Sequence, residues 1–135
     1  MENYKIKTEV EISETNIEEI LDSSFEGGSN YWLMIQGKDI TRISKKFNGQ
    51  RNIVKLILSG ASIPIYDYEE GIKLGELSLV DIINALQAMA NGKDLNGKEN
   101  SHLKWHFKNL IDGNDDAETN DVIVQIATMK EIVFG

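Results

Sequence analysis

The chain has 135 residues, a hydrophobic fraction of 41% and a single proline, which predicts one globular domain spanning residues 1–135. It contains no cysteine, so a disulfide framework, a thiolate metal site and a cysteine nucleophile are excluded. The net charge of −8 argues against a protein that wraps nucleic acid, because phosphate contacts require lysine and arginine. The first twelve residues do not resemble a signal peptide and no apolar run is long enough to cross a bilayer, so we expect a soluble cytoplasmic protein without a membrane partner.

In chain order, the first predicted element is a half-buried strand over residues 4–12, where apolar and charged side chains alternate. Residues 13–28 then change to helical spacing, with apolar side chains on one stripe. Ser13 and Thr15 are competing N-caps for this helix. The adjacent glycines 27–28 are expected to supply a left-handed residue that ends it.

The middle of the chain is less clearly patterned. The apolar residues 30–35 fit either a strand or a short helix, and residues 51–61 are equally ambiguous. Residues 36–50 are basic and turn-rich. Residues 62–79 predict two short strands around an acidic turn. Pro64 has no amide proton, so it should lie on an edge strand or at a strand start.

Residues 78–92 give the clearest helical pattern, capped by a serine. A flexible polar loop is expected over 91–100, a short helix over 101–111 and an acidic loop over 112–121, with Asp116 capping a final helix. The last five residues should close the chain as a strand or a buried tail. The side chains expected to face the core on these helices are Leu79, Ile82, Ile83, Leu86, Met89 or Ala90, Leu103, Phe107, Leu110, Ile111, Val122, Ile123, Ile126, Ala127 and Met129. These elements predict an α+β fold, with a small antiparallel sheet and about four helices packed mainly on one side.

Charge is segregated along the chain. Residues 9–26 hold seven acids and no base, residues 112–121 hold five acids and no base, and residues 38–55 hold six bases and one acid. Acidic segments can occupy the basic groove of a partner that normally binds nucleic acid, although an acidic surface is also an ordinary route to solubility. The candidate partner-binding acids are Glu14, Glu18, Glu19, Asp22, Glu26, Asp112, Asp115 and Asp116.

No pattern for catalysis or metal binding stands out. His102 and His106 share a helix face but lack a third ligand, so we expect them to face solvent or a partner. The acidic residues 112–121 lack the order of an EF-hand loop and have a sufficient role beside a helix N-terminus. Phosphate loops and nucleophile motifs are absent. The sequence therefore predicts a non-enzymatic protein with no catalytic residue, metal site or cofactor.

Asn30, Tyr31 and Trp32 form a candidate ligand pocket directly after the glycine pair. Asn30 offers both a donor and an acceptor to a base edge, and the aromatic rings could stack on a base. The competing interpretation is that these aromatic side chains belong to the core, which is the commoner role.

Three stretches, "FEGGSNYW", "SGASIPIYDYEEGIKLGELSLVDIINAL" and "DVIVQIATMKEIVFG", together resemble a family of small accessory proteins from bacteriophages and prophages of Firmicutes and related bacteria. Members carry an E-G-G-x-N-Y-W element, a strand pair leading into a helix, and an Ile-Val-Gln helix ending in Glu-(Ile/Val)-Val-(Phe/Tyr)-Gly. The resemblance implies no activity that can be carried over to particular residues. It implies a setting, which is a mobile-element protein in the cytosol of an infected or lysogenic bacterium.

Three hypotheses follow from these observations. The first is an inhibitor of a bacterial defence system, most concretely an anti-CRISPR protein whose acidic surface competes with nucleic acid for a nucleic-acid-guided nuclease. The second is a sponge for a nucleotide second messenger that binds near Asn30 and Trp32. The third is a homo-oligomeric structural or regulatory module of a mobile element. Residues Lys38 to Lys55 could dock on the acidic segments of a second copy, giving a homodimer, or could touch RNA or DNA directly.

Overall fold

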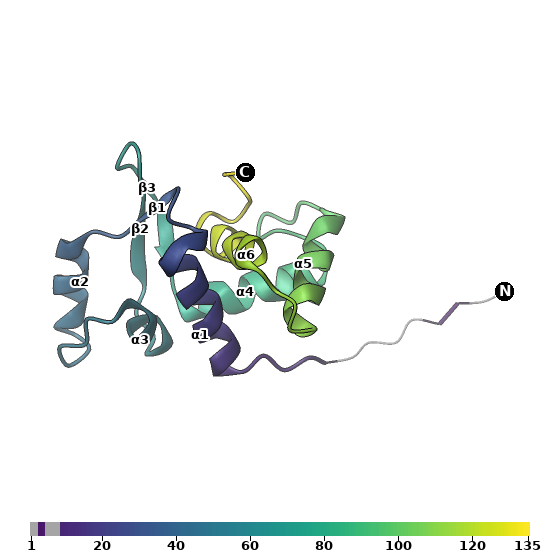
Figure 1. The fold of residues 1–135 in the computed structure, drawn as a ribbon, viewed down its shortest axis with the longest axis horizontal. Coiled ribbons are helices and arrows are strands. Elements are labelled where there is room, and N and C mark those ends of the chain that lie inside the picture. Colours follow the sequence, from purple (N-terminus) through teal and green to yellow (C-terminus); the bar gives the residue numbers. More distant parts are fainter. Residues whose placement is uncertain (1–2, 5–8) are drawn as a thin grey trace.

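The computed structural model describes residues 3–4 and 9–135, and Figure 1 shows its ribbon. Within these residues there are six α-helices, one π-helical turn and three strands. They are α1 (Glu14–Ser23), η1 (Ser24–Gly28), β1 (Leu33–Met34), α2 (Gly37–Ser44), α3 (Ile53–Leu58), β2 (Ile63–Asp67), β3 (Lys73–Leu77), α4 (Leu79–Ala90), α5 (Ser101–Ile111) and α6 (Ala117–Met129). The α+β prediction is confirmed, with more helices than the four expected.

The three strands form one antiparallel sheet in the order β1-β2-β3. The two strands expected around the acidic turn are β2 and β3. Pro64 is the second residue of the central strand β2, yet β1 pairs only with Tyr66 and Asp67. Pro64 therefore has no partner in β1, and its lack of an amide proton breaks no hydrogen bond there. The proline pairs with Glu76 of β3 on its other side.

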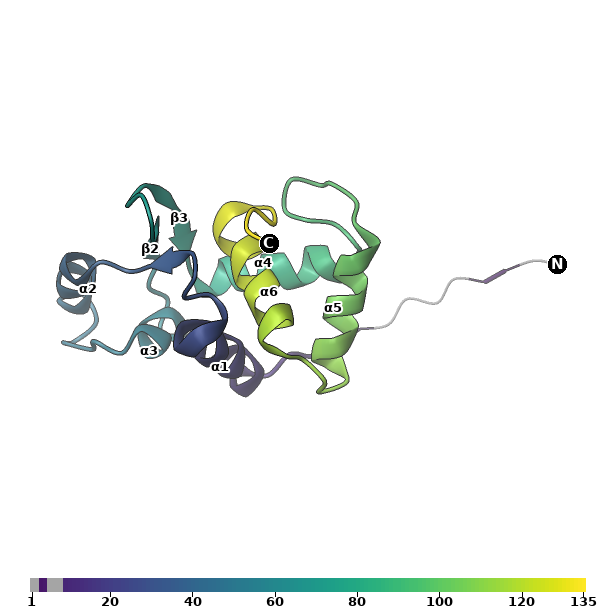
Figure 2. The same ribbon diagram turned by 45° about the horizontal axis from the view of Figure 1, so that its top comes forward.

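Helix α6 is the centre of the molecule. Every side chain from Thr119 to Thr128 is buried, so the helix is covered on all sides by α1, α4, α5 and β3. The backbone of β3 lies directly against α6, because a Cβ atom added at Gly75 would collide with the carbonyl oxygen of Thr128. In both views the sheet stands between α2 and the group formed by α4, α5 and α6 (Figures 1 and 2).

Helix α4 begins as its sequence predicts, and of the two N-caps considered for α1 the structure shows Ser13, so the Thr15 alternative is wrong. The side chains of Ser13 and Ser78 each accept a hydrogen bond from the amide three residues on, and each completes a capping box. The predicted glycine stop of α1 is wrong, because Gly27 has φ 173°, which is extended backbone. The helix instead widens into the π-helical turn η1, in which the amide of Ser29 donates to the carbonyl of Ser24 at 2.9 Å.

Several other expectations are corrected. The turn-rich interpretation of residues 36–50 missed α2, which exposes Lys38, Thr41 and Arg42 and buries Ile40 and Ile43 together with Asp39 and Ser44. Ile83 is 50% exposed and Ile111 is 39% exposed, so neither belongs to the core. His106 is buried on α5, although only apolar side chains of this helix were expected to face the core. The stripe of α4 also includes Ala85.

Neither end of the chain forms a strand in the described residues. The predicted strand 4–12 falls partly on residues 5–8, which lie outside the described residues, and residues 9–13 form neither helix nor strand. The C-terminal residues 130–135 form no strand, and all of them except the half-buried Phe134 are exposed, so the expectation of a strand or a buried tail is wrong. Among the described residues, no helix is long and apolar enough to cross a membrane.

Candidate functional site

The carboxylate of Asp121 is a buried acceptor that joins two distant parts of the chain. It accepts hydrogen bonds from Ser29 Oγ at 2.7 Å, Tyr31 Oη at 2.6 Å and Trp32 Nε1 at 2.7 Å. A fourth donor is Nε2 of Gln125, one helical turn along α6, at 2.9 Å. Asp121 itself is 6% exposed. Burying a carboxylate has a large desolvation cost, and the four hydrogen bonds to its oxygens offset that cost.

The side-chain amide of Gln125 holds the C-terminal tail. Its Oε1 accepts hydrogen bonds from the backbone amides of Val133 and Phe134 at 3.0 and 2.9 Å, and its Nε2 donates to the carbonyl of Phe134 at 3.0 Å. The ring of Phe134 stacks on that of Trp32, with centroids 5.5 Å apart. These contacts hold the "SNYW" segment and the "VFG" segment together against α6. We call this group of contacts, which is organised by Asp121 and Gln125, the joint.

This joint changes the interpretation of the candidate ligand pocket. Trp32 is 1% exposed and its ring is covered by Phe134, so it cannot offer a free face for stacking. Asn30 and Tyr31 are exposed, but the Tyr31 hydroxyl is bound to Asp121. Partial burial and this hydrogen bond both raise the pKa of Tyr31 well above its usual range, which keeps the hydroxyl as a donor. These contacts favour a structural role for Tyr31 and Trp32.

Sequence reasoning missed the residues that organise this joint. Asp121 had been grouped with the acidic loop, whereas the structure places it in the second turn of α6. The available signal was the pair of polar residues Asp121 and Gln125, which are spaced i, i+4 within an otherwise apolar run. A polar pair on a face that must be buried indicates a hydrogen-bonded network.

Helix α1 and the loop between α5 and α6, which carry most of the candidate acids, lie on the same side of the molecule. Helix α1 packs against α6, and η1 packs against the beginning of α6. At this contact Gly28 lies so close to Ala117 that an added Cβ would come within 3.2 Å of the Ala117 carbonyl oxygen. Figures 1 and 2 show α1 and the α5–α6 loop on the lower side of both views. We call the eight candidate acids the acidic face: Glu14, Glu18, Glu19, Asp22, Glu26, Asp112, Asp115 and Asp116.

The acidic face carries its charge without internal neutralisation. Within the described residues the one side-chain ion pair joins Arg42 to Asp39, which is elsewhere in the fold. Asp116 caps α6 by accepting a hydrogen bond from the amide of Thr119 at 2.9 Å. That hydrogen bond lowers the pKa of Asp116, so this carboxylate stays ionised at neutral pH. Six of the eight acids are exposed, and Asp22 and Asp115 are half-buried.

The two histidines of α5 have different environments. His102 is exposed and stacks on Trp105, whose ring is 48% exposed. His106 is buried, contrary to expectation, and a 2.8 Å hydrogen bond joins its Nδ1 to Oγ1 of Thr119. Burial and the neighbouring His102 lower the pKa of His106. His106 therefore packs α5 onto α6 as a neutral side chain.

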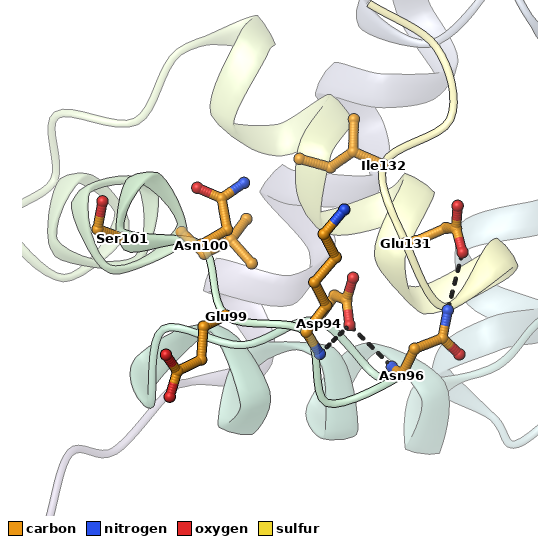
Figure 3. Close-up of a pocket in the computed structure, with 9 residues that line it drawn as sticks. Asp94, Asn96, Glu99, Asn100, Ser101, Glu131 and Ile132 are labelled. Carbon is orange, nitrogen blue, oxygen red and sulfur yellow. Dashed lines mark hydrogen bonds between the residues drawn. The ribbon is translucent and has the colours of Figure 1, made fainter.

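A polar cavity of about 490 Å³ lies between residues 94–101 and the start of the C-terminal tail (Figure 3). The backbone amides of Asn96 and Lys98 both donate to Asp94 Oδ1 at 2.9 Å. Asn96 also donates from Nδ2 to Glu131 at 2.8 Å, so the expected polar loop is fastened to the tail. A second cavity of about 550 Å³ lies beside Gly75 and Thr128. Neither cavity includes a residue of the candidate ligand pocket or the acidic face.

No protein-family model, curated protein or solved structure matches this chain. Among the described residues, no three histidine, aspartate or glutamate side chains are grouped so that they could hold a metal ion. The two main features of the described structure are the buried hydrogen-bonded joint around Asp121 and the exposed acidic face.

Proposed function

We propose that this protein is a non-enzymatic inhibitor that works by binding, and that its acidic face occupies a basic, nucleic-acid-binding groove on a bacterial defence protein. The most specific form of the proposal is an anti-CRISPR protein that competes with nucleic acid for a nucleic-acid-guided nuclease. The resemblance to phage and prophage accessory proteins supplies the setting in which such an inhibitor would act.

The observation that carries the proposal is the joining of two acidic segments, about 90 positions apart, at the contact between η1 and α6. Glu26 lies two residues before Gly28, and Asp116 immediately precedes Ala117, the residue against which Gly28 packs. Helix α1 extends this charge with Glu14, Glu18 and Asp22 at a regular four-residue spacing.

The spacing suits a groove that binds a phosphate backbone. Residues four apart on a helix are about 6 Å apart along its axis, so the three acids of α1 extend over about 12 Å. The phosphates of one DNA strand advance about 3.4 Å per nucleotide along the duplex axis. The acids therefore present negative charge along a line, as a nucleic-acid strand does, although at about half its density.

The same features favour fast association with a basic partner. Surface charges that are not paired internally contribute to the field outside the protein, and complementary fields raise association rates. Such contacts are screened by salt over about 8 Å at physiological ionic strength. We therefore expect inhibition to weaken as the salt concentration rises.

The test uses a panel of purified nucleic-acid-guided nucleases, assayed for target binding with and without this protein. The charge-reversal variant replaces four exposed glutamates of the acidic face with lysine: Glu14, Glu18, Glu19 and Glu26. A matched variant reverses four exposed glutamates elsewhere: Glu69, Glu70, Glu76 and Glu99. The proposal expects inhibition of at least one nuclease by the wild type and by the matched variant, and its loss in the acidic-face variant. An inhibition that survives reversal of the acidic face would contradict it.

A further inference from the structure

Residues 36–59, which form α2, α3 and the loop between them, make up a basic lobe at one end of the molecule. This lobe holds six bases and one acid, a net charge of +5, in a chain whose net charge is −8. The remainder therefore carries 8 bases and 21 acids, a net charge of −13. Both ribbon views place α2 at the end of the described structure opposite α5 (Figures 1 and 2). All six cations are exposed: Lys38, Arg42, Lys45, Lys46, Arg51 and Lys55.

Three of these cations lie on one face of α2 and its C-cap, and a fourth lies beside them. Lys38, Arg42 and Lys45 are spaced i, i+4, i+7, which places them within about 60° of one another around the helix and over about 10 Å along it. Arg51 comes from the loop, and its Nη1 donates to Oγ1 of Thr41 at 3.3 Å. This hydrogen bond brings the fourth cation to the flank of the same face. We call these four side chains the cationic strip.

The strip has almost no neutralising partner inside the protein. The one acid of the lobe, Asp39, is 7% exposed, and it contacts Arg42 at 3.3 Å. In the described part of the chain, Lys38, Lys45 and Arg51 form no ion pair. Like charges at this helical spacing repel and destabilise the helix. The arrangement thus has an electrostatic cost in the isolated protein, which an anionic partner would remove.

Two neutral side chains that flank Arg51 in the sequence, Gln50 and Asn52, are arranged as donors. The Oδ1 of Asn52 is occupied by the amide of Lys55, and the Oε1 of Gln50 is occupied by the amide of Asn52. Each side chain thus uses its acceptor internally and keeps its NH₂ group for other partners. Phosphate oxygens accept hydrogen bonds and donate none, whereas a protein surface offers both kinds of group. A surface of cations and donors fits a phosphate backbone better than it fits an acidic protein.

We propose that the basic lobe binds the sugar-phosphate backbone of a nucleic-acid strand through the cationic strip, without reading its sequence. No exposed aromatic side chain lies in the lobe for stacking on bases, which is consistent with contacts to phosphates alone. The negative charge of the remaining chain is screened beyond about 8 Å at physiological ionic strength. This proposal does not rest on the proposed function, because it uses different residues at a different end of the fold.

Fluorescence anisotropy of labelled 20-nucleotide single strands and a 20-base-pair duplex would test the proposal, with salt varied from 50 to 200 mM. If four cations contact phosphates, the slope of log K against log salt is about −3.6 for duplex and about −2.8 for single strands. For duplex DNA this corresponds to a loss of affinity of roughly 150-fold over that range.

The discriminating variant replaces Lys38, Lys45 and Arg51 with glutamine and leaves Arg42 in place, so that Asp39 keeps its partner. We expect the duplex slope to fall to about −0.9 and the affinity at 50 mM salt to drop at least tenfold. The matched control makes the same change of charge at three exposed lysines outside the lobe: Lys73, Lys93 and Lys108. Circular dichroism melting confirms that both variants fold.

Three results would overturn the proposal. The first is no measurable binding to any probe at 50 mM salt. The second is an equal loss of affinity in the control, which would assign the effect to net charge and not to the strip. The third is absence of nucleic-acid binding together with a concentration-dependent dimer that disappears in the strip variant, which would assign the lobe to a second copy of this chain. Reversal of the acidic-face glutamates should leave nucleic-acid binding intact, so this proposal and the proposed function can fail separately.

Discussion

Replacing Asp121 with alanine should destabilise the fold more than any other single removal of a charge. The change removes the common acceptor of four hydrogen bonds. Ser29 and Trp32 are 0% and 1% exposed, so their donors would be left without water, at a cost of about 1–3 kcal/mol each. Tyr31 is 49% exposed and can turn its hydroxyl to solvent. Gln125 loses one acceptor, but its Nε2 still donates to the carbonyl oxygen of Phe134.

The size of the effect follows from these terms. Two orphaned donors cost about 2–6 kcal/mol, and the variant no longer buries a carboxylate, which offsets part of that cost. We therefore expect a loss of about 2–4 kcal/mol in the free energy of unfolding. For a chain of 135 residues this lowers the melting temperature by roughly 8–16 °C.

Urea unfolding followed by the fluorescence of the two tryptophans would measure this loss, because one of the indoles donates directly to Asp121. The control is Glu118→Ala, which removes an exposed carboxylate from the same helix and should cost less than about 1 kcal/mol. If Asp121→Ala costs no more than the control, the joint does not stabilise the fold and our account of the "SNYW" and "VFG" segments is wrong.

Three further variants test the packing of the fold. Gly75→Ala should cost more than about 2 kcal/mol, measured by thermal melting, because the backbone of α6 occupies the space of the new methyl group, whereas Gly37→Ala meets nothing within 4 Å and should be nearly neutral. Because burial lowers the pKa of His106, its contribution to stability is present above the ordinary pKa of about 6.5. That contribution is lost as the pH falls below this value, by up to about 1.4 kcal/mol per pH unit. His106→Gln should remove this pH dependence from the melting curves, and His102→Gln should keep most of it, because burial is the larger cause of the lowered pKa and His102 the smaller one. Phe134→Ala should cost about 1–2 kcal/mol and make the tail more sensitive to carboxypeptidase; a protease resistance equal to that of the wild type would contradict the anchoring of the tail.

The elements that sequence predicts well are those with a local signal for both ends and a clear period. Helix α4 has a capping serine, an apolar stripe and a glycine with φ 72° just beyond it. The hairpin of β2 and β3 is similarly marked by its acidic turn. The short helix α2 was missed because its eight residues are mostly polar and basic. Its helical state is fixed by packing Ile40 and Ile43 into the core, which a local window does not reveal.

The joint around Asp121 could not be assembled from sequence for a different reason. The donors of the "SNYW" segment and their acceptor are separated by about 90 positions, and Asp121 continues a run of acids. Only its i, i+4 spacing from Gln125 sets it apart from the other four acids of residues 112–121. The resemblance did mark both segments, but as separate motifs. That the two segments contact each other follows only from the structure, in which α6 is buried on every side. Asp121 and Gln125 must therefore find hydrogen-bond partners inside the protein.

The acidic face was better defined by sequence, because charge segregation requires no tertiary information. What the sequence lacked was the contact between Gly28 and Ala117, which brings the charge of η1 to the beginning of α6. The same charge count marked the basic lobe. The hydrogen bond between Arg51 and Thr41 was needed to place its loop cation beside α2.

The most direct test of the central claim is a competition assay on one guide-loaded nuclease that the wild-type protein inhibits, comparing the two four-glutamate charge reversals under identical conditions. We predict that reversing Glu14, Glu18, Glu19 and Glu26 restores target binding, and that reversing Glu69, Glu70, Glu76 and Glu99 leaves inhibition intact. Equal inhibition by both variants, with both folded, would contradict binding through the acidic face.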